Sequence, residues 1–383
     1  MKRMSKNVNY MTGFQTGCEI MKKVVVGLSG GVDSSVAAFL LKEQGYDVLG
    51  VTMLMWAPDG KEPQSVTDAR KVAEHLDIPY YVLDFTAQFK KEVVDYFTEE
   101  YLAGRTPNPC NMCNRRIKWE ALLSWAHEQG AEYIATGHYA RIDLLENGRY
   151  AIRNSVTAQK DQTYALCNLT QEQLKHTLLP VGEYTKDEIR RIAAEQGLPV
   201  AHKSDSQDIC FIPDGDYGAF LEQQIPDRIP GEGNFVLKDG TVIGRHKGVT
   251  HYTIGQRKGL GIAMGHPVFV CEIRPETNEV VIGENEDIFS CDLICSNVNY
   301  MGMEEGKEPE RCVAKVRYAH KGDRCELRKL PDGRMQVRFD KTVRAITPGQ
   351  SVVFYDGEYV LGGGVIEGNM YSATELLKDI EKE

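Results

Sequence analysis

The sequence predicts an α/β protein built on a doubly wound parallel sheet and followed by a β-rich region. Three observations support this fold class. Short apolar runs alternate with helical patterns over residues 24–140. A polar, glycine-rich turn follows the first apolar run at residues 27–35. From about residue 218 helical periodicity fades, and glycines separate short β-rich runs.

The first unit reads as a buried strand at residues 24–26, the turn GLSGGVDSS at 27–35 and a helix at 36–41. Gly30 and Gly31 have no Cβ, so backbone can approach a ligand there. Serine hydroxyls and the free N–H groups of the helix complete an anion site. The turn has no Gly-Lys-Ser/Thr ending, so it is not a Walker loop. We interpret it as a phosphate cradle; an ordinary strand–helix turn is the alternative.

The next elements continue the alternation and are expected as a strand at 45–56, a helix at 65–76, a strand at 78–85, a helix at 89–101, a loop at 103–116, a helix at 117–129 and a strand at 131–140. Met53 lies near the end of the second strand, where open α/β sheets bind ligands. Thr136, Gly137 and His138 would end the last strand on the same rim. A plain histidine at a strand end is the alternative for His138.

Residues 149–170 place the polar island Lys160-Asp161-Gln162 between strand-like flanks, with a charged surface turn as the alternative. A helix is expected over 184–199, followed by a polar loop that ends near Cys210. The β-rich part holds a basic, glycine-rich stretch at 233–262. It also contains a hairpin at 266–285 and barrel-like strands at 311–320, 325–330, 335–340 and 351–366.

Length and composition limit the class of protein. A chain of 383 residues suggests two or three domains. The net charge of −10 argues against indiscriminate nucleic-acid binding, but not against a local basic surface. No apolar run reaches the roughly 18 residues of a membrane span, and residues 1–20 lack the apolar core of a secretory signal. We therefore expect a cytoplasmic protein with no membrane partner.

Three of the ten cysteines stand out by position. Cys110-x-x-Cys113 precedes a predicted helix, whose positive end is expected to lower the thiol pKa. This spacing suits a metal site, a redox pair or a nucleophile, and also arises by chance. Cys210 follows a polar loop. The remaining cysteines are Cys18, in the N-terminal extension, and six with strand-like apolar contexts that predict core positions: Cys167, Cys271, Cys291, Cys295, Cys312 and Cys325.

Several motifs together resemble a known family. The turn at 27–35 resembles the PP-loop of the N-type ATP pyrophosphatases. Six further motifs occur in the order typical of the tRNA-specific 2-thiouridylases, and the resemblance runs from about residue 22 to 367. They are GRTPNPCNMCNRRIKW (104–119), ATGHYAR (135–141), KDQTYAL (160–166), DSQDICF (205–211), YTIGQRKGLG (252–261) and KVRYAH (315–320).

The resemblance implies a PP-loop catalytic domain at 22–217, a small central domain at 218–288 and a C-terminal β-barrel at 289–383, after a disordered extension at 1–21. It implies an enzyme that replaces the 2-oxygen of the wobble uridine, position 34 of tRNA, with sulfur. ATP and Mg²⁺ are the implied cofactors, with AMP and pyrophosphate as products. The implied partners are the tRNA anticodon stem-loop and a sulfur donor, either a persulfide carrier such as a cysteine desulfurase, or sulfide.

The resemblance also implies roles for single residues. Cys113 matches the catalytic nucleophile, and Cys210 matches the cysteine that carries a persulfide. The nucleotide site matches Gly27, Leu28, Ser29, Gly30, Gly31, Val32, Asp33, Ser34, Met53 and Gly137. The family residues that meet the target base match Asn108, Pro109 and Cys110. The family residues that make other tRNA contacts match His138, Lys160, Asp161, Gln162, Arg317, Tyr318 and Gln350. Because the chain is acidic, affinity for tRNA must come from local cations such as Arg115, Arg116, Lys118, Arg245, Lys247, Arg257 and Lys258.

One position departs from the family. Many members have aspartate where this chain has Cys110, and that aspartate is thought to assist proton transfer. Three thiolates, from Cys110, Cys113 and Cys210, are enough to ligate a 4Fe–4S cluster with one open iron. We therefore hypothesise a cluster-dependent route beside the persulfide route, with zinc as a weaker option. The alternatives for the whole chain are a PP-loop ligase that uses an amine or ammonia, and a non-catalytic RNA-binding protein.

Overall fold

The structure is a computed structural model that describes residues 21–204 and 209–369. The predicted extension at 1–21, apart from Met21, lies outside the described residues, and so do Cys18 and residues 205–208. In the part of the chain that the structure describes, no helix is long and apolar enough to cross a membrane.

A parallel sheet forms the centre of the N-terminal part, in the order β3-β2-β1-β4-β7. Its strands are β1 (Lys23–Gly27), β2 (Asp47–Leu54), β3 (Tyr80–Asp84), β4 (Tyr133–Ala135) and β7 (Thr177–Leu178). The chain leaves β1 on one side for β2 and later returns on the other side as β4. The predicted doubly wound sheet is thereby confirmed, and its switch point lies between β1 and β4.

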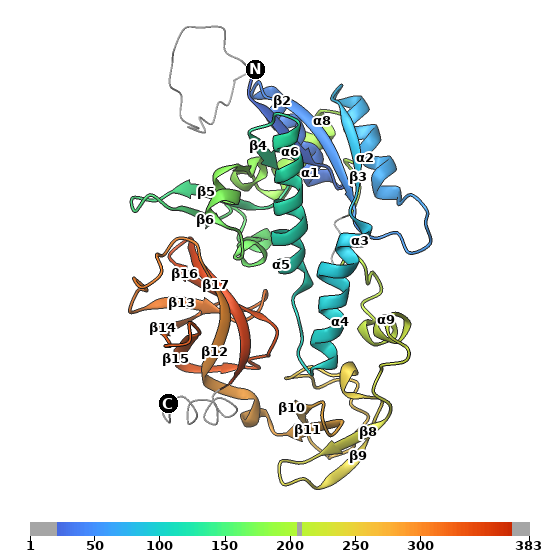
Figure 1. The fold of residues 1–383 in the computed structure, drawn as a ribbon, viewed down its shortest axis with the longest axis vertical. Helices are drawn as coiled ribbons and strands as arrows, with labels where there is room; N and C mark the ends of the chain where they lie inside the picture. The colour runs from blue at the N-terminus through green and yellow to red at the C-terminus, as the bar shows by residue number, and fades with distance from the viewer. Residues whose placement is uncertain (1–20, 205–208, 370–383) are drawn as a thin grey trace.

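Helices cover both faces of this sheet (Figure 1). Val24 and Val26 pack with α1 (Val32–Glu43), whereas Val25 packs with α6 (Leu122–Glu128) on the other face. Successive side chains of a strand point to opposite faces, so a fully buried strand has an unbroken apolar run. Two further helices, α2 (Gln64–His75) and α8 (Lys186–Glu195), join α1 in covering the first face.

Two long helical segments extend from the sheet toward the rest of the molecule (Figure 1). The first comprises α3 (Thr86–Phe89), a π-helical stretch η1 (Lys90–Val94) and α4 (Asp95–Leu102). The second comprises α5 (Pro109–Cys113), the π-helical η2 (Asn114–Ala121) and α6. Residues 103–116 were expected to form one loop, and this is wrong for their second half. Asn108 caps a helix there, and Pro109 occupies its first turn, a position that proline favours.

The chain continues through a hairpin and short helices. The hairpin is β5 (Ala140–Leu144) and β6 (Tyr150–Asn154). The polar island was expected between strands, but 3₁₀ turns η3 (Ala158–Lys160) and η4 (Thr163–Leu166) surround it. The backbone bends there because side-chain bonds from Asp161 close a turn. Two more short elements follow, α7 (Gln171–Lys175) and η5 (Pro180–Glu183).

A small sheet and a barrel complete the fold. Near residue 218, where the sequence becomes rich in β-strand patterns, the chain first forms a helix, α9 (Tyr217–Gln224). This helix was not predicted, because Phe220 and Leu221 are its only buried residues. The small sheet has the strand order β10-β11-β8-β9. Its strands are β8 (Gly233–Val236), β9 (Val242–His246), β10 (Phe269–Arg274) and β11 (Glu279–Gly283), and the 3₁₀ turn η6 (Val249–His251) lies between β9 and β10 in the chain. The predicted hairpin is β10–β11 and is confirmed.

The barrel closes because β12 pairs with both β15 and β17. After η7 (Asn285–Ile288), its strands are β12 (Phe289–Tyr300), β13 (Cys312–Lys315), β14 (Asp323–Lys329), β15 (Met335–Arg344), β16 (Ser351–Asp356) and β17 (Tyr359–Asn369). The β5–β6 hairpin joins this sheet where Tyr359 pairs with Arg153. The barrel therefore lies next to the β5–β6 hairpin and below it in the view of Figure 1.

The cysteines outside the three candidates follow the core prediction with exceptions. Cys167, Cys295, Cys312 and Cys325 are buried, whereas Cys271 is half-buried. Cys291 is exposed, so its predicted core position is wrong. It lies near the start of β12, where alternate residues face solvent, and the apolar context could not show which face it takes.

Candidate active site

The predicted phosphate cradle forms between β1 and α1. Gly31 begins the helix, and no described side chain caps it, so N–H groups of its first turn are left for an anion. The serines brace the turn instead. Ser34 Oγ accepts from the Ser29 N–H at 3.1 Å, and Ser35 Oγ donates to the Gly31 carbonyl at 2.8 Å. This geometry suits a polyphosphate.

Two glycines are required by close packing of backbone on backbone. Gly30 has a φ of +68°, and a Cβ there would lie 2.2 Å from the carbonyl oxygen of Ser65. A Cβ on Gly137 would lie 2.5 Å from the backbone nitrogen of Ser34. The end of β4 therefore rests directly on the phosphate loop, and these two sequence-predicted residues share one rim of the sheet.

Two lysines that the sequence analysis did not single out support this loop. Lys186 Nζ lies 2.7 and 2.9 Å from the carboxylate oxygens of Asp33, to which Tyr139 also donates at 2.7 Å. Lys203 Nζ donates to the Gly30 carbonyl at 2.9 Å and to Asp68 at 2.7 Å. Proximity of Lys203 to the DSQDICF motif was the one signal for it. These contacts fix the loop and bring positive charge to its edge.

Met53 connects the nucleotide rim with the cysteine region. It is half-buried near the end of β2 and packs against two cores: one beneath the sheet and one that holds Trp56 and Cys113. Its neighbour Met55 places Sδ 3.6 Å from Cys113 Sγ. The nucleotide side and the sulfur side of the candidate site are thus adjacent through a single strand.

The Cys110-x-x-Cys113 motif forms α5 rather than a loop before a helix. Asn108 caps it by accepting from the Asn111 N–H at 3.4 Å, so Cys110 lies in the first turn and Cys113 at the last residue. Burial raises the pKa of Cys113 to about 12. The expected lowering of the thiol pKa is therefore wrong for Cys113, because burial outweighs the field of a short helix and Cys113 is at the wrong end of it.

Cys210 approaches α5 from a separate loop. Its neighbour Phe211 is buried among aromatic rings, with centroids 6.1 Å from Trp56 and 5.5 Å from Phe89. Loss of hydration raises the pKa of Cys210 although the residue is exposed, and Cys110 raises it further. Cys210 and Cys110 in turn raise the pKa of Cys113, so the three predicted cysteines lie within electrostatic reach of one another.

The three cysteines do not fit the hypothesised metal cluster. Among residues 21–204 and 209–369, no group of three or more His, Cys, Asp or Glu side chains has the arrangement of a metal site, and Cys110, Cys113 and Cys210 are all in these ranges. One of the three, Cys113, is buried with a raised pKa, which disfavours the thiolate that a metal needs. We carry neither the 4Fe–4S route nor the zinc option further.

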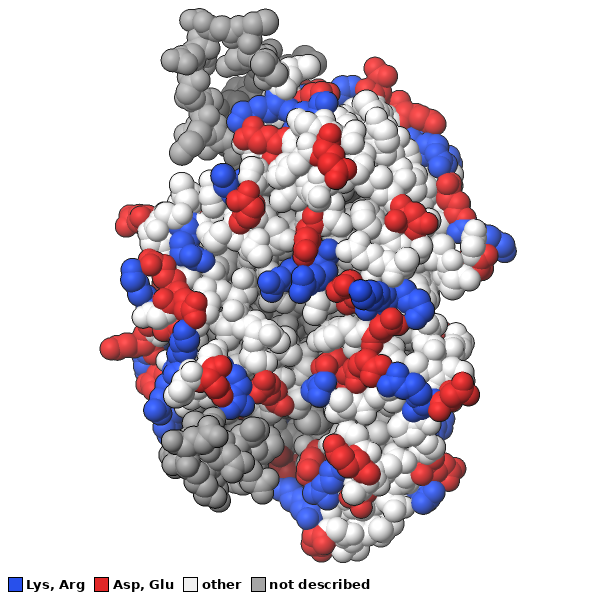
Figure 2. Space-filling view, in the orientation of Figure 1, with Lys and Arg blue, Asp and Glu red and all other residues white. Residues whose placement is uncertain are grey.

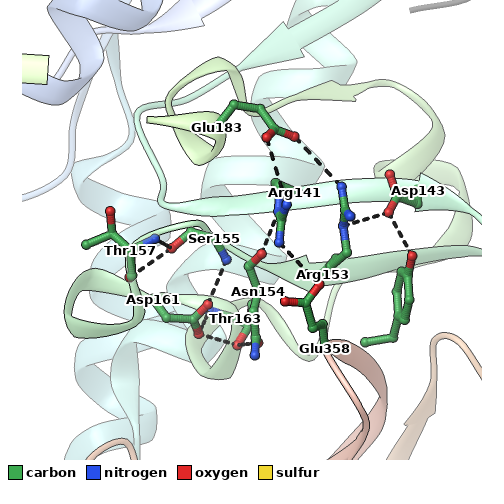
Figure 3. A network of polar contacts seen from close by, with 11 residues as sticks. Arg141, Asp143, Arg153, Asn154, Ser155, Thr157, Asp161, Thr163, Glu183 and Glu358 are labelled. Atoms are coloured by element: carbon green, nitrogen blue, oxygen red, sulfur yellow. Dashed lines mark hydrogen bonds and ion pairs between the residues drawn. The ribbon is translucent and has the colours of Figure 1, made fainter. Parts of the chain in front are cut away.

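The predicted tRNA contacts at 160–162 form a turn held from within. Asp161 accepts from the Ser155 N–H at 3.0 Å and from the Thr163 hydroxyl at 2.5 Å, as Figure 3 shows. Gln162 accepts from the Tyr139 N–H at 2.8 Å. Lys160 is half-buried at the start of this turn.

An ionic network on the β5–β6 hairpin lies beside the same turn (Figure 3). Arg153 Nε lies 2.8 Å from Asp143, and Arg141 Nε donates to the Asn154 carbonyl at 2.6 Å. Glu183 lies 3.8 Å from both arginines. The network thus joins the hairpin to η5, and the turn connects to it through Ser155, which directly follows β6 and donates to Asp161.

Two barrel residues, Arg317 and Tyr318, were predicted as tRNA contacts, and Tyr318 contacts the 160–162 turn. Tyr318 is 54% exposed, and its hydroxyl donates to the Asp161 carbonyl at 2.9 Å. Arg317 donates to the Arg344 carbonyl at 2.8 Å, and burial, with Arg344 nearby, lowers its pKa. Tyr318 thus lies beside the 160–162 turn, 157 positions away in the chain, whereas the contact of Arg317 is with the backbone of Arg344.

The barrel also holds the cysteine loop. Gln350 Nε2 donates to the carbonyls of Thr106 at 2.8 Å and Pro107 at 3.3 Å. Asn111, between the two cysteines, donates to Ser351 Oγ at 2.6 Å. Gln350 was predicted as a tRNA contact; here its amide supports the loop that carries Asn108–Cys110. The supporting role of Asn111 and Ser351 was missed, because residues 240 positions apart carry no local signal.

His138 lies at the end of β4 beside both halves of the site. Its Nδ1 is 2.8 Å from Thr136 Oγ1, and its ring centroid is 5.4 Å from that of Trp119. Burial, with Lys118 nearby, lowers the pKa of His138 to about 3. The imidazole is therefore neutral at physiological pH and suits hydrogen bonding or stacking rather than binding of phosphate.

This depressed pKa predicts an acid-dependent loss of stability. The unfolded chain takes up a proton on His138 near pH 6.5, but the folded chain does so only near pH 3. Stability from this residue is thus present above pH 6.5 and lost as pH falls toward 3. Between pH 8 and pH 5 we expect a loss of about 2 kcal/mol from this group. Urea denaturation of the wild type and of His138→Gln at both pH values measures it.

The control is His202→Gln, since His202 is exposed. It should keep the wild-type loss between the two pH values, whereas His138→Gln should reduce it. An equal loss in all three proteins contradicts the assignment.

The surface around the site is mixed in charge. Figure 2 shows Lys and Arg gathered beside the hollowed middle of one face, while acidic and basic residues alternate over the rest. Some cations of the chain are neutralised in exposed ion pairs, for example Arg228 with Glu99 and Arg116 with Glu120.

Comparison with known proteins decides the family. Family profiles described as the tRNA methyl transferase HUP domain, the tRNA methyl transferase PRC-barrel domain and the aminomethyltransferase β-barrel domain match residues 22–214, 218–284 and 290–366. The tRNA-specific 2-thiouridylase MnmA of Lachnoclostridium phytofermentans is 58% identical over 356 residues, which cover 90% of this chain and 99% of that protein. This chain belongs to the tRNA-specific 2-thiouridylase family.

Other members of the family are similarly close. The tRNA-specific 2-thiouridylase MnmA of Clostridioides difficile is 51% identical over 358 residues, 91% of this chain and 99% of that protein. Among solved structures, a 4-thiouridine synthetase in complex with RNA and ATP is 22% identical. It covers 54% of this chain and 51% of that chain with a TM-score of 0.38. The thiouridylase relatives therefore carry the assignment.

Proposed function

We propose that this thiouridylase-family protein transfers sulfur to the 2-position of the wobble uridine of tRNA in an ATP-dependent reaction. One observation carries the proposal: the phosphate loop and α5 both contact the chain at the end of β2, where Thr52 donates to the Leu28 carbonyl and Met55 contacts Cys113. A site that holds a triphosphate beside nucleophilic sulfur suits activation of an oxygen followed by attack of sulfur. The family's thiouridylase relatives support the same reaction.

The first step is adenylation of the base. The uracil 2-oxygen attacks the α-phosphate of MgATP, forming an O–P bond and breaking the bond to pyrophosphate. A carbonyl oxygen is a poor leaving group, and the attached AMP makes it a good one. N–H groups at the start of α1 receive the charge of the departing pyrophosphate, with Lys203 at the edge of the loop. Gly27 to Ser34, Met53 and Gly137 form the proposed nucleotide site.

The second step transfers sulfur. With sulfide as the source, hydrosulfide would attack C2 directly and expel AMP. With a persulfide carrier, the Cys210 thiolate takes the carrier's outer sulfur, and the carrier's own S–S bond breaks to release its thiolate. That sulfur attacks C2 of the base and expels AMP. Cys113 thiolate then attacks Cys210 Sγ, which breaks the bond to the transferred sulfur, leaves 2-thiouridine and forms a Cys113–Cys210 disulfide. A dithiol reductant restores the two thiols.

The tRNA is proposed to lie across the catalytic part and the barrel. The wobble base must leave the anticodon stack to reach the sulfur carried by Cys210. Asn108 to Cys110 would meet this base, and the neutral His138 would stack or hydrogen bond nearby. The turn at 160–162 with Arg317 and Tyr318 would contact the anticodon arm, with Gln350 beside the base loop.

The same proposal covers the domain limits and the compartment. We place the catalytic domain at 22–217, the central domain at 218–288 and the barrel at 289–383, which the limits of the three matched profiles support. A tRNA substrate supports the cytoplasm as the site of reaction.

The deciding experiment is nucleoside analysis of unmodified tRNA after reaction with the full chain, ATP and either sulfide or a persulfide donor. We expect 2-thiouridine at position 34, with one AMP and one pyrophosphate per sulfur. Omission of ATP should abolish it. Formation of AMP with an aminated base, or tRNA binding without turnover, would overturn the proposal in favour of an amine-using ligase or a binding protein.

A further inference from the structure

Lys118 lies on the helical segment that carries two of the three candidate cysteines. It follows Cys113 by five positions, and η2 is π-helical from Asn114 onward. In a π-helix, residues five apart are successive along one face, so the side chain of Lys118 lies on the face of Cys113. Its neighbours Ile117 and Trp119 are fully buried, and Lys118 itself is half-buried.

The surroundings of Lys118 contain sulfur but no carboxylate partner. Within residues 21–204 and 209–369, Lys118 forms no ion pair with Asp or Glu, unlike Lys186 and Lys203 nearby. The titratable groups that face it are Cys113 and Cys110 from α5, Cys210 from the opposite loop and the neutral His138 from the end of β4. Partial burial of an ammonium group without a carboxylate partner costs folding free energy unless another anion binds next to it.

The chemistry of the site supplies that anion. Sulfur reacts as a thiolate or as a persulfide anion. Burial disfavours negative charge on these cysteines, so a nearby cation is needed to stabilise either anion. Burial acts to lower the pKa of Lys118, but Cys113, Cys110 and Cys210 together hold it above its ordinary value. Lys118 therefore stays charged while the cysteines react.

We propose that Lys118 is the charge partner of sulfur: its ammonium group holds the thiolate of Cys113, and the persulfide on Cys210, in the anionic form during transfer. The role rests on the proposed function for its timing, but the charge at the thiols can be measured without tRNA or ATP. Lys118 acts through the cysteines and is a positioning residue rather than a catalytic one. It was previously only one of seven candidate tRNA cations.

The test compares alkylation of the full-length protein by iodoacetate, an anion, and iodoacetamide, which is neutral but otherwise similar. Peptide mass mapping gives the ratio of the two rates at Cys110 and Cys210. Cys291 is exposed on the barrel and serves as internal reference. A cation at the thiols favours the anionic reagent, so the wild-type ratio at Cys110 and Cys210 should exceed that at Cys291 and fall with added salt.

Lys118→Met should lower this ratio about fivefold or more, and Lys118→Arg should restore it. Arg116→Met is the matched control, since Arg116 lies on the same segment but is exposed and pairs with Glu120. It should leave the ratio unchanged. An unchanged ratio in Lys118→Met, or an equal fall in Arg116→Met, overturns the proposal. If Lys118→Met does not fold, a salt-independent wild-type ratio overturns it instead.

The proposal also predicts a split between the two steps. In Lys118→Met, sulfur transfer should slow about 10- to 100-fold while tRNA-dependent AMP formation continues. If wild-type protein shows the alkylation effect but thiolates no tRNA, the proposed function fails and the charge role of Lys118 stands.

Discussion

Cys113→Ser and Cys210→Ser should each lower formation of 2-thiouridine by at least about 10³-fold, because a serine hydroxyl replaces the attacking thiolate or the persulfide carrier. The phosphate loop contains neither residue, so ATP binding and pyrophosphate release should continue with adenylated tRNA as the product. Single-turnover reactions assayed in parallel for thiouridine, AMP and pyrophosphate measure both steps.

Cys291→Ser is the matched control, since Cys291 is exposed on β12 in the barrel. It should retain full activity. Loss of pyrophosphate release together with thiolation in Cys113→Ser would show that the two halves of the site are not separable. Retention of thiolation in both variants would favour a nucleophile other than these cysteines.

Gly137→Ala should lower kcat/KM for ATP about 100-fold or more. The added Cβ would lie 2.5 Å from the nitrogen of Ser34 and 2.6 Å from the carbonyl carbon of Asp33. Both neighbours are backbone atoms, so the phosphate loop must shift, and loss of about 1 Å in such positioning costs roughly two orders of magnitude in rate. Pyrophosphate release at varied ATP concentration measures the change.

Gly231→Ala is the control, because nothing lies within 4 Å of a Cβ at Gly231 and its φ is not positive. It should behave as the wild type. Isothermal titration with a non-hydrolysable ATP analogue separates lost binding from lost turnover in Gly137→Ala. A variant with unchanged affinity and unchanged turnover would remove Gly137 from the nucleotide site.

The sequence predicted the layered architecture well, because local patterns report on local structure. Apolar runs marked β1 and β2 as strands buried on both faces, and the glycines and serines at 27–35 marked the phosphate turn. The hairpin β10–β11 followed from the Pro-Glu-Thr-Asn turn at 275–278, and the barrel strands followed from short β-rich runs joined by Asp-Gly turns. Backbone conformation depends mainly on neighbours in the chain, so such elements can be read before the fold is known.

The burial and the charge of the site residues depend on contacts with distant parts of the chain. The sequence placed Cys113 at the favourable end of a helix, yet burial raises its pKa, and burial is set by Phe211, Ile117 and other members of a core drawn from distant segments. Gln350 and Ser351 meet the cysteine loop only because the barrel packs beneath it. In the sequence, Lys118 is one of seven candidate tRNA-binding cations, and only the fold brings it close to three thiols.

The sequence by itself determined which residue types this protein brings to its chemistry: a glycine- and serine-rich phosphate loop, three cysteines and a set of polar turns. Only the tertiary structure decided which of them are charged, which are buried and which support another. The physical reason is that hydration and charge pairing depend on neighbours in space. In this protein some of those neighbours come from very distant segments: Asn111 and Ser351, for example, are 240 positions apart.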